Sequence, residues 1–302
     1  MYLGIDFLVS PDLRPYAVEV NVGLPGGAQE HDLTCLVRTG RRSGVFQKIE
    51  EISREVYGKP FREYLYSLPW LESLKPFKLW LDGQGPFPRA IHPALRLEDK
   101  WVQYLILSPL FPMPETRLFD PANRAEAERF LAQKRRLVGK RRLGRGGRDF
   151  RLIDRPEDLA TMTPGDYGHL LQERVDSRVG LYVFSVRSVA FAGRHVCLYA
   201  NLASRAYSNH GILAYIDSGD RLMLSEEEFV TRTFNQRSWE AEIWFGQGEP
   251  AYLRHNLYED EVATAAVVLP AGVLASIQEI SVRIERFYES LDFAALPAAF
   301  FE

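Results

Sequence analysis

The sequence predicts an α+β fold in which most strands pair in hairpins. Strand-like runs separated by turn residues occur near the N-terminus and again between residues 136 and 216. Helical periodicity is confined to a few other segments. The chain has 302 residues, of which 46% are hydrophobic and 25% are charged. These values are typical of a globular protein with about two domains.

The composition argues against several classes of protein. The net charge of −3 shows that the chain is not basic overall, and two cysteines are too few for a disulfide scaffold. The first residues lack the cationic stretch of a signal peptide. The least polar stretch, residues 262–276, contains Pro270 and is shorter than the about 20 residues of a spanning helix. We therefore expect a cytoplasmic protein without a membrane partner.

The first expected elements are a hairpin and a helix. Residues 3–9 and 16–22 are expected to pair around the turn SPDLRP, because Pro and Asp favour turns. A helix is expected over residues 44–57, with Ser43 as its N-cap and Gly58 as its stop. Its apolar residues recur at helical spacing: Val45, Ile49, Ile52 and Val56.

The remaining elements follow from the same patterns. Residues 60–98 are rich in aromatic residues and proline without a clear period, so we expect a packed connector. A helix is expected over 122–135, short strands over 136–184, and two or three strands over 186–216. The clearest helix is 271–291, in which six apolar residues share one face: Val273, Ile277, Ile280, Ile284, Phe287 and Leu291.

The opening hairpin carries polar side chains within apolar strands. Glu19 and Asn21 are two residues apart, so they share one face of their strand. If Val9 pairs with Tyr16, Asp6 lies directly opposite Glu19. Two carboxylates about 4 Å apart repel by roughly 4 kcal/mol at an effective dielectric constant of about 20. A proton, an arginine or a metal ion must offset this repulsion.

Two interpretations of the hairpin remain open from its residues alone. Carboxylate and amide oxygens are hard donors of the kind that Mg²⁺ prefers, which favours a metal site. The alternative is a solvated outer face, or a salt bridge from a carboxylate to one of the many arginines.

The stretch GIDF…YAVEVNVGLPGG resembles the metal-binding hairpin of ATP-grasp enzymes. In that family an aspartate is followed by a glutamate thirteen positions later and by an asparagine two further on, before a Pro-Gly turn. Asp6, Glu19, Asn21 and Pro25–Gly26 keep this spacing. The resemblance implies that the three polar side chains hold one or two Mg²⁺ ions that bridge the phosphates of ATP. Many members carry arginine where this chain has Gly4.

Three further segments resemble the nucleotide-binding elements of the same family. Residues 99–116 resemble the helix that begins Asp-Lys, and residues 138–150 resemble the second lysine strand with its glycine-rich loop. Residues 170–175 resemble the hinge strand whose backbone contacts the adenine edge. The resemblance implies that these residues bind ATP: Lys100, Lys140, Gly144, Gly146, Gly147, Gln172, Glu173, Arg174 and Val175.

The stretch that begins at Ser185 resembles a strand with an inner arginine and a later Arg-x-x-x-Asn-x-Gly turn. The resemblance implies that Arg187 contacts the nucleotide and that Arg205 and Asn209 are catalytic. Family members often carry an acidic residue for the ribose hydroxyls at the position of Ser185; the ribose contact of this chain stays open, with Asp176 as the candidate substitute.

The order of these segments differs from the usual family order, because the hairpin comes first. The resemblance therefore implies a circular permutation, in which residues 3–9 join the sheet formed by strands from 185–216. Helix 271–291 is then expected to pack beneath that sheet. The expected domains are a hairpin and helix of the catalytic subdomain (1–60), a connector (61–98), a nucleotide lid with the hinge (99–175) and the remaining catalytic subdomain (176–302).

The resemblance implies an ATP- and Mg²⁺-dependent ligase. ATP phosphorylates a carboxylate, and an amine then displaces phosphate from the acylphosphate. The implied partners are a small-molecule or peptide carboxylate and an amine acceptor, whose identities stay open, as does the oligomeric state. Lys100, Lys140 and Arg205 would stabilise the transferring group. The alternatives are a small-molecule kinase on the same fold and a non-catalytic nucleotide or nucleic-acid binder.

Three features have plainer interpretations. The run KRRLVGKRRLGRGGR has eight basic residues in fifteen, which is typical of a nucleic-acid patch. Its glycines also suit a phosphate loop, and the negative net charge disfavours nucleic acid as the partner. His31 follows the Pro-Gly-Gly turn and is expected in a loop, and Cys197 is expected in the core.

Overall fold

A computed structural model describes residues 1–22, 24–88, 91–144, 150–162, 168–179, 182–203, 212–219, 235–237 and 261–298. The fold is mixed α+β with two β-sheets. The chain divides into two compact units, of which unit 1 contains Met1–Leu68 and Asp176–Leu291, and unit 2 contains Pro69–Val175 and Asp292–Glu302. Within the described part of the chain, no helix has the length and apolar character needed to cross a membrane.

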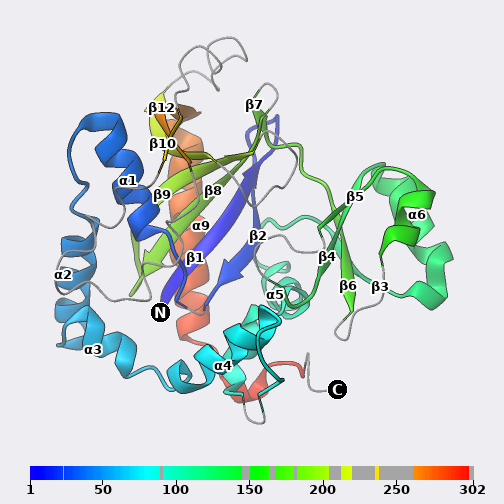
Figure 1. Cartoon of the computed structure of the whole chain (residues 1–302), viewed down its shortest axis with the longest axis horizontal. Coiled ribbons are helices and arrows are strands. Elements are labelled where there is room, and N and C mark those ends of the chain that lie inside the picture. The colour runs from blue at the N-terminus through cyan, green and yellow to red at the C-terminus, as the bar shows by residue number, and fades with distance from the viewer. Residues whose placement is uncertain are drawn as a thin grey trace. The chain divides into compact units, whose positions relative to one another are not determined.

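Unit 1 is built on an eight-stranded sheet (Figure 1). The strand order is β11-β12-β10-β9-β8-β1-β2, and β7 also pairs with β8. The strands are β1 (Tyr2–Val9), β2 (Pro15–Asn21), β7 (Arg178–Val179), β8 (Tyr182–Phe191), β9 (Arg194–Ala203), β10 (Ile212–Gly219), β11 (Asn235–Arg237) and β12 (Glu261–Pro270). β1 pairs antiparallel with both β2 and β8, so it lies inside the sheet.

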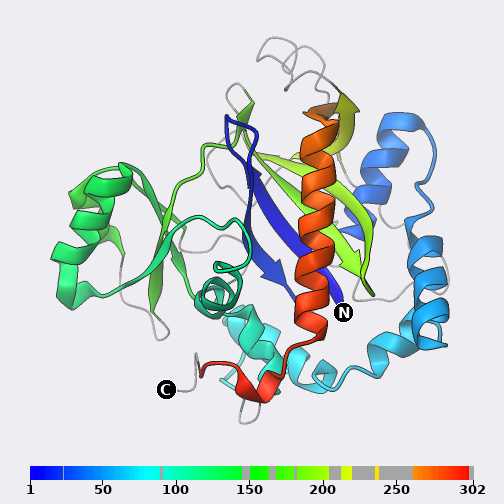
Figure 2. The same cartoon turned by 180° about the vertical axis from the view of Figure 1, so that it is seen from behind.

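Helices cover both faces of this sheet. They are α1 (Ala28–Thr39), α2 (Val45–Tyr57), α3 (Phe61–Tyr66) and α9 (Ala271–Glu289). α9 runs along one face, as Figure 2 shows, and Ser281 of α9 is 2.8 Å from Ser188 of β8. α1 begins on the opposite face, because Gly27 packs against Val189, whose side chain alternates with that of Ser188.

The expected placement of the first strand is confirmed. β1 pairs with β8, within the predicted region 185–216, and α9 packs against β1, β8 and β9. The amino group of Met1 contacts the carboxylates of Glu285 and Glu289 in α9. The hairpin is therefore part of the sheet and not an appendage to it.

The expected register of the hairpin is confirmed at one end and wrong at the other. Asp6 lies opposite Glu19 as predicted. A bulge next to Asp6 then shifts the register by one residue, so Val9 pairs with Pro15 and not with Tyr16. The alternation of apolar residues does not reveal a bulge, because one extra residue leaves both flanking patterns intact.

Several elements of unit 1 were not expected from the sequence, among them α1 and β12. α1 has no clear apolar period because several of its buried side chains are polar: Gln29, Glu30, Asp32 and Thr34. β12 was treated only as an apolar stretch, and it pairs in parallel with β10. α2 begins and ends as expected, although its N-cap residue is Gly44; the Ser43 hydroxyl still accepts a bond from the amide of Val45 at 3.2 Å.

Unit 2 contains a four-stranded antiparallel sheet in the order β3-β6-β4-β5. The strands are β3 (Thr116–Phe119), β4 (Leu137–Arg141), β5 (Arg151–Ile153) and β6 (His169–Glu173). The expected helix 122–135 is α6 (Arg124–Lys134), whose Phe130 and Leu131 share a core with Leu137, Ile153 and Leu171.

The segment 61–98 is more regular than the sequence analysis expected. It contains α3, α4 (Leu71–Leu81) and the 3₁₀ helix η1 (Pro93–Glu98), and it is divided between the two units after Leu68. The helices are short and α4 contains Pro76, so no apolar period extends over several turns. α5 (Lys100–Leu107) follows η1 directly, and further 3₁₀ turns are η2 (Pro121–Asn123), η3 (Pro156–Thr161) and η6 (Phe293–Ala295).

Candidate functional site

The polar cluster of the hairpin is centred on an ion pair between two strands. Arg187 of β8 donates to Asp6 of β1 through Nε at 2.7 Å and through a terminal nitrogen at 2.6 Å. The two residues are direct cross-strand partners. Asn21 donates from its amide nitrogen to Asp6 at 3.2 Å and to the carbonyl of Gly4 at 3.3 Å. One carboxylate therefore binds both a guanidinium and an amide.

This geometry shows that an arginine offsets part of the repulsion between the paired carboxylates. For Asp6, the salt-bridge alternative is confirmed: Arg187 neutralises its charge, and the two side chains are 17% and 23% exposed. Burial by itself would lower the pKa of Arg187, but the neighbouring carboxylate of Asp6 holds it well above its ordinary value. The guanidinium of Arg187 is consequently protonated at every physiological pH.

Glu30 is a member of this cluster that the sequence analysis missed. It lies in the first turn of α1 and is 3% exposed, and its carboxylate accepts a hydrogen bond from the amide of Gly27 at 2.6 Å. Its charge also acts on Arg187. The spacing Gly-x-x-Glu directly after the Pro-Gly turn was the available signal, because an acidic third residue commonly caps a helix.

Three carboxylates and one guanidinium belong to this cluster. Asp6 and Glu19 are cross-strand partners, and the charges of Asp6 and Glu30 both act on Arg187. Within the described ranges, no group of three or more His, Cys, Asp or Glu side chains could hold a metal, so a site here needs the Asn21 amide as well. Two carboxylates and an amide oxygen are donors that fit Mg²⁺.

Close packing of two glycines fixes the position of the polar cluster relative to the Pro-Gly-Gly turn. A Cβ atom on Gly4 would lie 2.7 Å from Cβ of Pro25, so any side chain at this position would force the turn to shift. The guanidinium of this cluster comes from Arg187 on the adjacent strand. Gly27 has φ +148°, and a Cβ there would lie 2.4 Å from Val189. The Pro-Gly-Gly turn therefore rests directly on β1 and β8, which brings the first turn of α1 to the ion pair.

Unit 2 brings together several of the residues expected to bind phosphate. Lys100 is 9% exposed, and its ammonium group donates to the carbonyl of Gly144 at 2.8 Å. Its backbone amide donates to the carbonyl of Arg142 at 3.1 Å. Lys140 lies on β4, opposite Leu170 of β6. The N-terminus of α5 and the segment after β4 are thus joined at Lys100.

The four residues that the resemblance predicts as a hinge run from the end of β6 into the segment that leaves it: Gln172, Glu173, Arg174 and Val175. The amide of Glu173 donates to the carbonyl of Glu115 at 2.8 Å, and the amide of Arg174 donates to the carbonyl of Arg136 at 3.2 Å. These two amides are used within unit 2, so a base would have to pair with other backbone groups of the segment.

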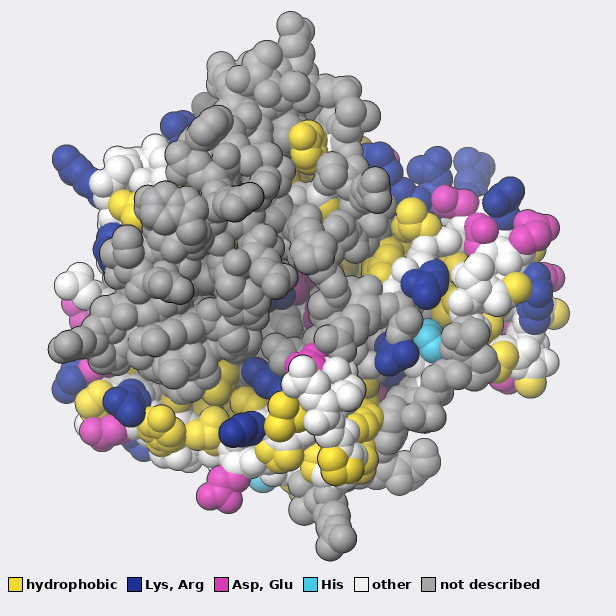
Figure 3. Space-filling view, viewed as in Figure 1, with side chains coloured by type: hydrophobic (Ala, Val, Ile, Leu, Met, Phe, Trp, Pro, Cys, Tyr) yellow, Lys and Arg dark blue, Asp and Glu magenta, His cyan; other side chains and the backbone are white. Residues whose placement is uncertain are grey.

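Four predicted residues lie outside the described part of the chain: Gly146, Gly147, Arg205 and Asn209. Basic residues of the run that includes the first two pair with acidic side chains where the structure describes them. Lys134 contacts Glu115 and Glu173 at 2.9 and 3.0 Å, and Arg142 pairs with Asp99. Figure 3 shows basic and acidic side chains interspersed over the surface of unit 2. This mixture weighs against a nucleic-acid surface.

The structure assigns His31 a different place from the expected loop. It lies in α1, and its Nδ1 is 2.8 Å from the carbonyl of Leu198. Lys48 of α2 donates to the carbonyl of Val196 at 2.9 Å, so side chains occupy two carbonyls of β9. Cys197 between them is buried as expected, and burial raises the pKa of its thiol. These residues stabilise the edge of β9.

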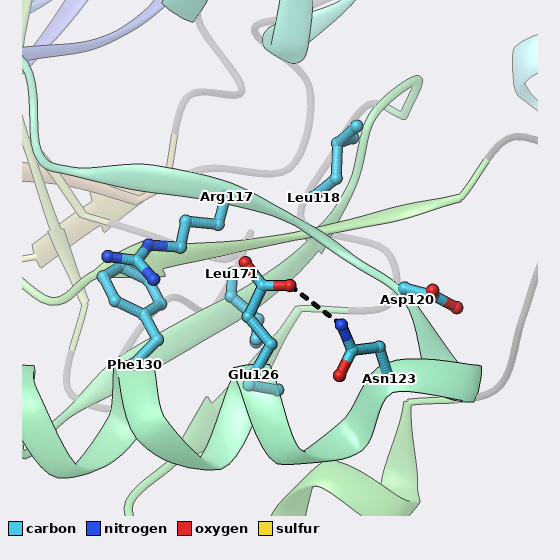
Figure 4. A pocket seen from close by; sticks show the side chains of 8 residues that line it. Arg117, Leu118, Asp120, Asn123, Glu126, Phe130 and Leu171 are labelled. Atoms are coloured by element: carbon cyan, nitrogen blue, oxygen red, sulfur yellow. Dashed lines mark hydrogen bonds between the residues drawn. The ribbon is translucent and has the colours of Figure 1, made fainter.

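A small hollow in unit 2 lies between β3 and α6 (Figure 4). The guanidinium of Arg117 stacks over the ring of Phe130 at 4.4 Å from its centroid. Asn123 donates to Glu126 at 3.1 Å on the same wall. The residues that line the hollow include none of those predicted to bind nucleotide.

No protein-family model matches this chain, and no curated protein matches it either.

Proposed function

We propose that this chain binds ATP and Mg²⁺ and joins a carboxylate to an amine through an acylphosphate, as a circularly permuted ATP-grasp ligase. The observation that carries the proposal is the pairing of Asp6 with Glu19 inside the sheet of unit 1. Asn21 donates a hydrogen bond to Asp6 at 3.2 Å, so all three proposed ligands lie close together. Like charges on cross-strand partners are destabilising, so a bound metal cation would stabilise this pair in addition to Arg187.

The residues of unit 1 would bind the metal directly or position its ligands. Glu19 and Asn21 would bind Mg²⁺ with Asp6, while Arg187 keeps the Asp6 carboxylate in one orientation. Bound Mg²⁺ would neutralise charge on the phosphate oxygens during transfer. The hydrogen bond from the amide of Gly27 fixes the carboxylate of Glu30. Its negative charge would add to the attraction of the site for Mg²⁺.

The residues of unit 2 would bind the phosphate groups. Lys100 and Lys140 supply two ammonium groups near the ends of α5 and β4, and Gly144 follows with its carbonyl already bound to Lys100. Charge-assisted hydrogen bonds from lysine to phosphate contribute about 1.5–3 kcal/mol each. Lys140→Ala should therefore weaken nucleotide binding about tenfold or more.

The permuted order is supported by the position of β1. The hairpin that ends an ordinary ATP-grasp chain begins this one, and β1 lies between β2 and β8 with α9 packed on them. That placement is what the resemblance implies for a chain in which the hairpin has moved from the end to the start.

The experiment that tests the proposal is an ADP-release assay with Mg·ATP and pools of carboxylates and amines. Release that requires both a carboxylate and an amine supports the ligase. A phosphorylated product formed without amine supports a kinase instead, and nucleotide binding without turnover supports a sensor. Absence of both binding and turnover overturns the proposal.

A further inference from the structure

We propose that the buried ion pair between Asp99 and Arg142 is a positioning element for the ammonium group of Lys100, and that it sets the affinity of the chain for nucleotide phosphates. This inference rests on the proposed nucleotide-binding function. It assigns roles to two residues that the family resemblance leaves without one.

Asp99 links two parts of unit 2 through one carboxylate. Its side chain is fully buried, and Oδ1 accepts a bond from the amide of Trp101 at 2.8 Å, which caps α5. Oδ2 accepts from Arg142 through Nε at 3.2 Å and through a terminal nitrogen at 2.9 Å. One oxygen therefore holds the start of the helix, and the other holds the segment after β4.

Lys100 lies between these two attachments. Its amide donates to the carbonyl of Arg142 at 3.1 Å, and its ammonium donates to the carbonyl of Gly144 at 2.8 Å. Arg142 is held from a third side, because its amide donates to the carbonyl of Gly168 at 3.3 Å. The location of the ammonium group consequently depends on how α5 and residues 142–144 are joined.

A buried ion pair is a costly way to gain stability alone. Desolvation of two charges offsets much of their attraction, and well-packed apolar residues often serve equally well. A paired guanidinium and carboxylate do impose a fixed geometry, which apolar contacts do not. Lysine has a long flexible side chain, and fixing it before phosphate arrives reduces the entropy lost on binding. The pair therefore suits a positioning role.

The test is a double-mutant cycle with Arg142→Gln and Lys100→Met, using titration calorimetry with Mg·AMP-PNP as the probe. If Arg142 acts through Lys100, Arg142→Gln weakens binding about tenfold in the wild-type background and less than about twofold when Lys100 is already methionine. Equal weakening in both backgrounds, or none, overturns the inference. Arg129→Gln on the exposed face of α6 is the matched control and should bind as the wild type does.

Two further results keep the outcomes distinct. If Arg142→Gln fails to fold, the variant Asp99→Asn/Arg142→Gln replaces it in the cycle, because it leaves no uncompensated buried charge. If the wild type binds Mg·AMP-PNP and Lys100→Met weakens binding, but the cycle is additive, the inference fails while the proposed function stands. If the wild type does not bind Mg·AMP-PNP, both fail.

Discussion

Arg187 on β8 holds both carboxylate oxygens of Asp6 on β1, at N–O distances of 2.7 and 2.6 Å. The two residues are 181 positions apart in the chain and direct partners in the sheet. This contact joins the N-terminal hairpin to the later strands at the point where the candidate metal ligands gather. It is therefore both a structural link and part of the proposed site.

Arg187→Met should destabilise unit 1 by about 3 kcal/mol, because it leaves the largely buried carboxylate of Asp6 without its counter-charge. Urea denaturation followed by circular dichroism measures the change. The matched control is Arg194→Met, which breaks an exposed pair with Glu55 and should change the free energy of unfolding far less. An equal loss of unfolding free energy in the two variants would show that the buried pair stabilises unit 1 no more than the exposed pair does.

Gly27→Ala should destabilise the protein by about 2–3 kcal/mol, because the new Cβ meets Val189 and φ is +148°. Gly272→Ala provides the comparison. A Cβ there meets nothing within 4 Å, and alanine favours the helix α9 by about 0.5–1 kcal/mol. Thermal unfolding of both variants should therefore show shifts of opposite sign, and two shifts of the same sign would contradict the packing described for the turn.

The stability of unit 1 should fall in acid because of His195. Burial, with the nearby charges of Lys48 and His31, lowers the pKa of His195 from 6.5 to about 4. Between these two pH values the unfolded chain binds more protons than the folded one, so the full stability present above pH 6.5 declines as the pH falls toward 4. A pKa shift of this size changes the free energy of unfolding by about 3 kcal/mol between the two pH values.

The free energy of unfolding of His195→Gln, measured at pH 7 and at pH 4.5, tests this account. The variant should lose less stability between the two pH values than the wild type does, because glutamine does not titrate. The same loss in both proteins would assign the acid sensitivity to other groups.

Deletion of residues 1–22 should unfold unit 1. The deletion removes β1 and β2, the strand pair that continues the sheet beyond β8, together with three fully buried side chains: Leu3, Ile5 and Phe7. Each such side chain contributes about 1.5–3 kcal/mol by burial. The truncated protein should show no cooperative thermal transition of unit 1. A single sharp transition near the wild-type temperature would mean that the hairpin is dispensable.

The parts of the fold that the sequence predicted are those with a local pattern. α2 and α9 have apolar residues at helical spacing, and the hairpin alternates around a turn. α1 could not be predicted in this way, because its buried Gln29, Glu30 and Asp32 hide the period that an apolar helix shows. The bulge beside Asp6 leaves no trace in a sequence pattern of period two.

The candidate site was predicted in its residue types but not in its connections. The spacing of Asp6, Glu19 and Asn21 was visible, and an arginine was one of three ways to offset the paired carboxylates. Choosing Arg187 required the pairing of β1 with β8, which is a long-range contact that local patterns do not determine. Glu30 was missed for the same reason, since its effect on Arg187 depends on how the first turn of α1 packs.

The central claim is that this chain binds a nucleotide through Mg²⁺ held by Glu19, and titration calorimetry with AMP-PNP tests it most directly. Wild-type protein and the control Glu51→Gln, changed on the exposed face of α2, should bind AMP-PNP in the presence of Mg²⁺ and at least about tenfold more weakly in EDTA. Glu19→Gln should lose this dependence on Mg²⁺. If Glu19→Gln binds with the same affinity and the same Mg²⁺ dependence as the wild type, or if the wild type does not bind AMP-PNP, the account is wrong.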